Sequence, residues 1–512
     1  MTKRLRLIAC LLAAALLTGC SAVPATNVVP VATLPPATVR YAAPVDDSTL
    51  NYIAVRPLYL PSLDRQRLLC QYESVALNHD RHDAESLIRA LLAHEGNSKV
   101  ASLGDGVRLT LYGDHPVEVA AGVCTVNLGS SALMLQDSAL YTACLAIAST
   151  LCELDDISSV NVLIADQAVG MDITLTLPLG VVKAHPGEEL TVLWEQMEAR
   201  RTPLGEDPSL MPVTATATLF FPLKDASGVI PETRNITFPG QSPQQLAAGL
   251  LSAMSAGAQY MPGVSSMPDM NSLMVYAPQV SDMTEGGRLV TLHFVSDLEH
   301  RLAALQLDQS CFMAAIVETL TTFVPSVTAV RIHIGANPIT SLYNGEHGSL
   351  LFPGGILRRS DFAPYLMTQS GICLASGQYL TRLNRTMPTA EAVSPRALLM
   401  HLMNGPTQEE RDAGIQSVLP EGLSPQDVLG VAIDGDTLIL NLSLRFADKI
   451  RLEAADYEQQ LCYAMVNTLC QAKGLRRVVF FFGGEMVETL GGDLYWGGEF
   501  LLSPGMNEPT KG

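Results

Sequence analysis

Apolar residues recur at helical spacing in three long stretches, Ala139 to Leu154, Asp308 to Phe323 and Tyr457 to Ala472. Each has one broad apolar face, which is typical of a helix packed on a core. Laid over one another, the stretches share an alanine and, four residues later, a Thr-Leu pair. The pairs are Thr150-Leu151, Thr319-Leu320 and Thr468-Leu469. Three helices in one register predict a repeated unit.

Short β-rich runs flank each of these helices. The alternation of Val290 to Phe294 is that of a half-buried strand, and Gly435-Asp436 between two alternating runs predicts a hairpin. Val117 to Gly122 fits the first strand of that hairpin in the first copy, with Val117 and Val119 aligned to Val431 and Ile433. The runs before the helices are Val123 to Leu128, Leu289 to Phe294 and Leu438 to Leu442, and those after them are Val160 to Ile164, Val330 to Ile334 and Val478 to Phe482.

An earlier helix starts alike in the three copies. Asp83, Ser242 and Ser394 stand where a side chain is expected to cap free backbone N–H groups, and a proline suited to the first turn follows both serines. Further β-rich runs precede this helix at 68–73, 217–221 and 377–383. Each copy therefore predicts an α+β sandwich, with two helices packed on a small, mostly antiparallel sheet.

These patterns divide the chain into five segments. We expect a signal peptide at 1–20, a tether at 21–50, and three tandem units at 51–185 (unit 1), 210–345 (unit 2) and 361–512 (unit 3). The tether is rich in Pro, Ala, Val and Thr, a composition that favours extended backbone. Between the units, Glu188 to Arg201 predicts a short helix, and Asn344 to Ser360 a loop or an additional hairpin.

The first twenty residues have the order of a lipoprotein signal peptide. A basic start precedes the apolar run Leu7 to Leu17 and the closing Leu17-Thr18-Gly19-Cys20. The run is too short to cross a bilayer, which needs about 20 residues. After cleavage, Cys20 would carry a diacylglycerol that anchors the protein to the outer face of the cell membrane. The alternative is an ordinary signal peptide with a chance cysteine.

The net charge narrows the range of partners. The chain carries a formal charge of −19, and loss of the signal-peptide cations Lys3, Arg4 and Arg6 would leave −22. Nucleic acid is therefore not an expected partner, since phosphate binding needs a basic surface. Anionic lipid would attract the protein only through its anchor. A basic protein partner is compatible with this charge, although acidity more often serves solubility.

The repeated unit resembles the GerM domain of sporulation and spore-germination lipoproteins. Unit 3 carries the resemblance best, in Ala397 to Pro406, Leu419 to Gly422, the strand Leu438 to Leu442, and Val466 to Leu469. These motifs are signatures of a fold, and none is a signature of catalysis.

Units 1 and 2 keep the apolar core pattern of unit 3 but differ from it at some of the motif residues. His94-Glu95 stands where unit 3 has Gly405-Pro406, and His293 replaces Asn441. The resemblance implies modules like those that build rings in the channel between mother cell and forespore. It thus implies assembly with envelope or sporulation-channel proteins, or with peptidoglycan. Tandem pairs are usual in this family, so three units are a departure.

Four cysteines are expected to be core residues rather than disulfide partners. Cys144 and Cys152 lie eight residues apart on one predicted helix, about 12 Å along its axis, which is too far for a disulfide. Cys462 and Cys470 take the same places in unit 3. Free buried thiols are therefore favoured, although export could allow oxidation.

The sequence offers few candidates for catalytic or metal-binding residues. His79 and His82 form the densest metal-like pattern, but with no third ligand nearby the sequence favours a solvated loop. The chain has no P-loop, zinc-protease helix motif or Gly-x-Ser-x-Gly elbow. We therefore expect no catalytic residue, cofactor or metal, and Cys20 as the one functional site.

Two classes of function remain. The first is a non-enzymatic, lipid-anchored scaffold for other envelope proteins in sporulation or germination. The second is an envelope enzyme, a ligand-binding protein or a peptidoglycan-acting protein with a cleft between units, expected near Glu188 to Pro208 or Asn344 to Ser360. A pocket with convergent titratable groups would favour the second class.

Overall fold

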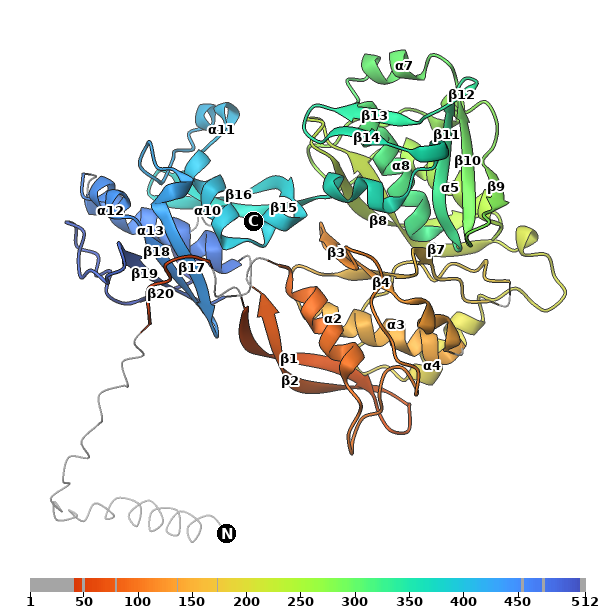
Figure 1. Ribbon diagram of the computed structural model, residues 1–512, viewed down its shortest axis with the longest axis horizontal. Coiled ribbons are helices and arrows are strands. Elements are labelled where there is room, and N and C mark those ends of the chain that lie inside the picture. Colours follow the sequence, from red (N-terminus) through yellow and green to blue (C-terminus); the bar gives the residue numbers. More distant parts are fainter. Residues whose placement is uncertain are drawn as a thin grey trace, which may run out of the picture. The chain divides into compact units, whose positions relative to one another are not determined.

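The computed structural model describes residues 41–47, 51–78, 81–135, 137–172, 174–452, 455–471 and 475–506 (Figure 1). The predicted signal peptide, Cys20 and His79 lie outside these residues. The chain from Ala43 to Gly512 forms one compact unit. Among the described residues, no helix combines the length and the apolar character needed to cross a membrane.

Unit 1 shows the arrangement that all three units share. A long hairpin comes first, then a helix, a second hairpin, a second helix and a returning strand (Figure 1). The four-stranded sheet has the order β3-β4-β5-β6, and β4 and β5 run parallel because α3 forms the crossover between them. The elements are β1 (Asn51–Pro61), β2 (Leu68–Asn78), α2 (Asp83–Ala93), β3 (Val117–Ala120), β4 (Val123–Leu128), α3 (Asp137–Leu151), β5 (Ser159–Ile164) and β6 (Gln167–Ala168).

Unit 2 repeats this order, with the sheet β12-β11-β10-β9 and a parallel β10–β11 pair. Its elements are β7 (Val213–Pro222), β8 (Val229–Phe238), α5 (Pro243–Ser255), α6 (Met270–Leu273), β9 (Gln279–Asp282), β10 (Arg288–Phe294), α7 (Leu298–Ala304), α8 (Gln309–Phe323), β11 (Val327–Ile334) and β12 (Asn337–Pro338).

Unit 3 does the same, with the sheet β17-β18-β19-β20 and a parallel β18–β19 pair. Its elements are β15 (Met367–Ser376), β16 (Tyr379–Pro388), α9 (Thr389–Ala392), α10 (Pro395–Asn404), α11 (Gln408–Asp412), β17 (Val428–Asp434), β18 (Thr437–Leu442), α12 (Leu444–Ile450), α13 (Ala455–Gln471), β19 (Arg477–Phe482) and β20 (Glu499–Leu501).

The second helix of each unit packs against both the first hairpin and the sheet. In unit 2, α8 contacts β7 and β11, and every residue from Ser310 to Phe323 is buried. Because α8 is covered on nearly all sides, its sequence is apolar with few polar exceptions. Helices α3 and α13 keep exposed polar residues near their starts, such as Asp137 and Gln459. This arrangement confirms the predicted α+β sandwiches built on two main helices, to which units 2 and 3 add short helices.

The shared threonine of each Thr-Leu pair has a structural role. Its hydroxyl accepts a hydrogen bond from a backbone N–H in the first strand of the hairpin, which joins helix to hairpin in the same way three times. The pairs are Tyr59 N to Thr150 (2.9 Å), Phe220 N to Thr319 (3.0 Å) and Cys373 N to Thr468 (3.0 Å). A buried N–H without such a partner would be costly.

Two local predictions need correction. The N-cap of α2 is His82, whose side chain accepts from Ala84 N, and Asp83 lies inside the helix and pairs with Arg56. An imidazole nitrogen can accept this bond as a carboxylate would. The β-rich runs before the first helix are not equivalent strands, since 68–73 lies in β2, the second strand of its hairpin, and 217–221 lies in β7, the first strand of its hairpin. Short β-rich runs do not by themselves identify their strand.

Other local predictions are confirmed. Ser242 and Ser394 cap α5 and α10. Helix α4 (Leu190–Glu198) lies between units 1 and 2, and β13 (Ser341–Asn344) and β14 (Gly348–Leu351) form the additional hairpin before unit 3. All described cysteines are free thiols, with Cys144, Cys462 and Cys470 buried and Cys152 half-buried. The unit boundaries themselves stay a prediction.

Ala43–Asp47, here called the strap, lies against unit 3. Pro44 O accepts a 2.8 Å hydrogen bond from Asn441 Nδ2, and the Asp47 carboxylate accepts two from Arg396, at 2.5 and 2.8 Å. The backbone N–H of Val431, in β17, donates to the same carboxylate at 2.9 Å. Part of the predicted tether therefore lies against α10, β17 and β18 of unit 3.

Candidate functional site

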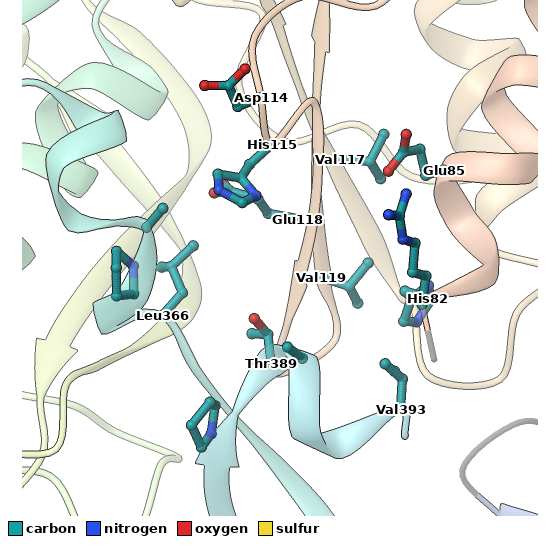
Figure 2. A pocket seen from close by; sticks show the side chains of 15 residues that line it. His82, Glu85, Asp114, His115, Val117, Glu118, Val119, Leu366, Thr389 and Val393 are labelled. Atoms are coloured by element: carbon teal, nitrogen blue, oxygen red, sulfur yellow. The ribbon is translucent and has the colours of Figure 1, made fainter. Parts of the chain in front are cut away.

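A groove of about 470 Å³ opens along β3 of unit 1. Figure 2 shows α2 on one side, with Glu85, the strand residues Val117 and Val119 at the back, and Leu366 and Thr389 on the opposite walls. A second hollow of about 380 Å³ shares His82, Val119, Thr389 and Val393 with it. The groove thus lies beside His82, between unit 1 and residues 363–393, which follow directly after the expected junction Asn344 to Ser360. The lining contains no described residue of the other expected junction, Glu188 to Pro208.

The back of the groove is a sheet edge. Strand β3 stands at the end of its sheet and pairs with β4 alone among the described strands. An edge strand offers one row of backbone groups to an added chain. Just after β3, the N–H of Ala121 donates to Thr368 Oγ1 at 3.0 Å, which holds the start of β15 next to it.

His82 is held at both ring nitrogens. Nδ1 accepts from the N–H of Ala84 at 3.1 Å, and Nε2 lies 2.8 Å from Asp156 Oδ2. Since Nδ1 is an acceptor, Nε2 carries the proton that bonds to the carboxylate. Neither nitrogen has a free lone pair for a metal or a substrate proton. His82 therefore shapes the groove rather than performing chemistry in it.

Glu118, on β3, is neutralised by a buried arginine. Arg359 donates to Glu118 Oε2 from Nε (3.2 Å) and from Nη2, and its Nη1 donates to Thr322 Oγ1 at 2.5 Å. The same Nη1 lies 2.5 Å from Glu318 Oε2, on the fully buried α8. This cluster joins unit 1, unit 2 and the segment before unit 3.

Burial and the neighbouring charges shift the pKa values of Glu318 and Arg359 within this cluster. Burial raises the pKa of the Glu318 carboxyl to about 8, against the opposing effect of Arg359. Burial alone would lower the pKa of Arg359, but the carboxylates of Glu118 and Glu318 raise it above its ordinary value. The favoured state at neutral pH is therefore Arg359 paired with Glu118 beside a protonated Glu318.

The groove lining combines an edge strand with apolar side chains and with titratable ones such as Glu85, Asp114 and His115. The lining as the structure describes it contains neither serine nor cysteine, and its two histidines are the capped His82 and the exposed His115. In the described part of the chain, no three His, Cys, Asp or Glu side chains gather to hold a metal ion. An edge strand facing apolar walls fits an extended polypeptide.

The predicted site residues and the observed site overlap little. Cys20 and His79 lie outside the described residues, so lipid attachment stays a prediction. His82, a candidate metal ligand in the sequence, lies in the groove as the N-cap of α2. The Arg359 cluster was missed, although Glu318 inside an otherwise apolar helix pattern was a signal that could have shown it.

The fold and the groove define a class of protein, namely tandem small α+β modules with an open edge strand beside a helix N-terminus. Residues 365–488 match the family model described as "Germane: Sporulation and spore germination". The match lies within unit 3 and confirms the predicted resemblance to the GerM family there. No curated protein matches the chain.

Two solved structures resemble parts of the chain. The tandem GerMN domains of the sporulation protein GerM from Bacillus subtilis are 16% identical, with 56% of this chain and 96% of that chain covered and a TM-score of 0.21. A putative lipoprotein from Clostridium perfringens is 19% identical, with 26% and 86% covered and a TM-score of 0.19. TM-scores this low give no basis for transferring residues or partners.

Proposed function

We propose that this protein is a lipid-anchored envelope protein that assembles with other envelope proteins during sporulation or spore germination, without catalysing a reaction. The observation that carries the proposal is the match of residues 365–488 to a sporulation and germination family. The threefold repeat of one small module supports an assembly role, because each copy offers a further surface for contacts.

The anchor rests on the first twenty residues. The basic start, the short apolar run and Leu17-Thr18-Gly19-Cys20 fit export followed by acylation of Cys20. Two acyl chains on that thiol would hold the protein stably on the outer face of the cell membrane. The capped His82 and the neutralised Glu118 support a role without catalysis, since neither is free to transfer a proton.

Replacement of the anchor residue tests both parts of this proposal. Cys20→Ser should abolish incorporation of an alkyne-labelled fatty acid, release the protein from the membrane fraction and reduce the yield of heat-resistant or germinating spores. Cys10→Ser is the matched control, because Cys10 lies in the signal peptide and would be removed with it. Labelling that survives in Cys20→Ser would refute the anchor, and unchanged spore yield and germination would refute the role.

A peptidoglycan-binding role is the second candidate, and the groove is the observation that favours it. Its volume of about 470 Å³ and its mixed polar and apolar lining are within the range of ligand sites. If this role is correct, the protein should sediment with purified sacculi, and Val119→Arg, which fills the groove, should prevent it. Sedimentation unaffected by Val119→Arg would exclude the groove as that site.

A further inference from the structure

Hairpin β1–β2 of unit 1 has two faces of different character. One face packs on the core, where α2 and α3 contact the hairpin (Figure 1) and Leu58 and Val75 are buried. Successive side chains of a strand point to opposite faces, so the alternate residues point away from the core. Among these, Ile53, Val55 and Tyr72 are exposed by 68%, 61% and 72%. The hairpin therefore presents large apolar side chains to solvent.

This outer face comprises the odd-numbered residues of β1, from Asn51 to Pro61, and the even-numbered residues of β2, from Leu68 to Asn78. None of them is charged, although the chain has 51 acidic and 32 basic residues. Glu153, outside the strands, accepts from the Tyr59 hydroxyl at 2.6 Å and places a carboxylate at one end of the face. A surface that is apolar and free of charge along two strands marks an interaction site.

The same places are polar in unit 2, which has the same fold. The two hairpins align by the backbone N–H that bonds to the shared threonine, which belongs to Tyr59 in unit 1 and to Phe220 in unit 2. Four residues of the outer face then correspond to four threonines. The pairs are Ile53 and Thr214, Val55 and Thr216, Tyr72 and Thr233, and Ala76 and Thr237. Threonine suits a strand as valine does, so the fold does not require apolar residues at these places.

In unit 2 this face of the hairpin is already a contact between two modules. Thr218, which corresponds to Pro57, is fully buried, and its hydroxyl lies 3.0 Å from Nδ2 and 3.2 Å from Oδ1 of Asn161, on β5 of unit 1. The outer face of a hairpin in this fold can therefore accept a second module. Since the same face of unit 1 is exposed, a module that covers it would have to come from a second copy of the chain.

The surface of the second copy that fits best is the same outer face. The outer face of the unit 2 sheet is the alternative, but it carries Arg331 beside His293 and His333. Burial of the Arg331 charge against apolar side chains would cost free energy. Two copies of the uncharged face can pack without burying a charge, and a contact between identical faces closes as a dimer with two-fold symmetry.

The size of the face sets the strength that such a dimer can have. Each strand has 11 residues, and at about 3.4 Å per residue the face is about 37 Å long and roughly 10 Å wide. Two copies would bury on the order of 800 Å² in total, less than the roughly 1,200–2,000 Å² of stable complexes. The dimer should therefore be weak in dilute solution, and confinement of both copies to one membrane by the predicted anchor would raise its population.

We propose that two copies of this protein associate through the outer faces of hairpin β1–β2, with Ile53, Val55 and Tyr72 of one copy packed against those of the other. The inference goes beyond the proposed function and does not rest on a role in sporulation. It can be tested in any cells that make and export the protein, so the dimer and the cellular role can fail separately.

The test is chemical crosslinking of the full-length protein in such cells. In a Cys70→Ser protein, Val55→Cys places a thiol near the middle of the outer face, and Leu351→Cys places one at an exposed position of β14. A short bismaleimide should join two Val55→Cys copies at a yield about tenfold higher than two Leu351→Cys copies, whose yield measures random collision. Two differently tagged copies recovered together identify the product as a dimer of this chain. The medium is analysed as well, so a missing anchor would not hide the dimer.

A second variant tests the apolar contacts themselves. Ile53→Thr, Tyr72→Thr and Ala76→Thr, added together to the Val55→Cys protein, introduce the residues that unit 2 has at these places, so the hairpin should still fold. The yield of dimer should then fall to that of Leu351→Cys, with an unchanged circular dichroism spectrum. Equal yields from Val55→Cys and Leu351→Cys, or a yield that the threonines leave unchanged, would overturn the proposal. A Val55→Cys product that contains a different protein in place of the second copy would also overturn it.

Discussion

At the scale of single residues, one hydroxyl in each unit fixes the helix to the hairpin. Thr319 is fully buried and accepts from the N–H of Phe220, which lies in the hairpin strand β7. Valine has nearly the same shape without the oxygen, so the substitution would leave that N–H buried and unpaired.

Thr319→Val should therefore lower the free energy of unfolding by about 1–3 kcal/mol. Thr321→Val is the matched control, since the Thr321 hydroxyl donates to Val317 O of its own helix, and that carbonyl can keep its helical bond. Thr321→Val should therefore lower the free energy of unfolding by less than Thr319→Val does. Urea unfolding followed by circular dichroism measures both, and equal losses would contradict the special role of the shared threonine.

The raised pKa of Glu318 predicts how the stability of the protein depends on pH. Its folded-state pKa is about 8 and its ordinary value is 4.5, so between these values the folded chain holds a proton that the unfolded chain releases. The stability contributed by this proton is present below about pH 4.5 and is lost as pH rises through 8. Glu318→Gln stays neutral throughout.

From pH 5 to pH 8, the free energy of unfolding of the native protein should therefore fall relative to Glu318→Gln, by on the order of 3 kcal/mol. Glu195→Gln, at an exposed position, should change in parallel with the native protein. Denaturant titrations at several pH values give the comparison. A constant difference between the native protein and Glu318→Gln would show that Glu318 is ionised in the fold.

At the scale of elements, the strap depends on the pair between Asp47 and Arg396, two residues 349 positions apart. The pair is partly exposed, so its loss should cost little stability, about 1 kcal/mol or less. It should nevertheless loosen the strap, because the ion pair acts together with the hydrogen bonds from Val431 and Asn441.

Arg396→Ala should therefore speed amide exchange of residues 43–47, measured by hydrogen–deuterium exchange mass spectrometry. Arg301→Ala, which removes an exposed pair with Asp297 on α7, is the control and should leave the strap unchanged. Gly430→Ala should act like Arg396→Ala through the clash with Pro44 O. Exchange unaltered by both substitutions would mean that other contacts hold the strap.

The elements also show how far the sequence alone could predict this molecule. Helices α3, α8 and α13 and the sheet strands followed from local periodicity and from the repeated Thr-Leu register, since these depend on neighbouring residues. The parallel strand pairs, the strap and the Arg359 cluster join residues distant in sequence, and periodicity carries no information about such pairs. For the same reason the groove beside Glu85 could not be predicted.

At the scale of the whole molecule, the chain carries three modules of one fold and a predicted lipid anchor. Residues 365–488 of unit 3 match a sporulation and germination family. Anchoring and assembly are proposals that only the protein in its cell can test. The chain's charge of −19 gives one further expectation, namely that its contacts with basic partners weaken as salt rises.

The most direct measurement is crosslinking and affinity capture of the anchored protein from sporulating and from growing cells, followed by mass spectrometry. The account predicts recovery of other envelope-assembly proteins from sporulating cells, at low salt more than at high salt, and their reduction in Cys20→Ser. The same proteins recovered from growing cells, or none from sporulating cells, would contradict a role in sporulation assembly.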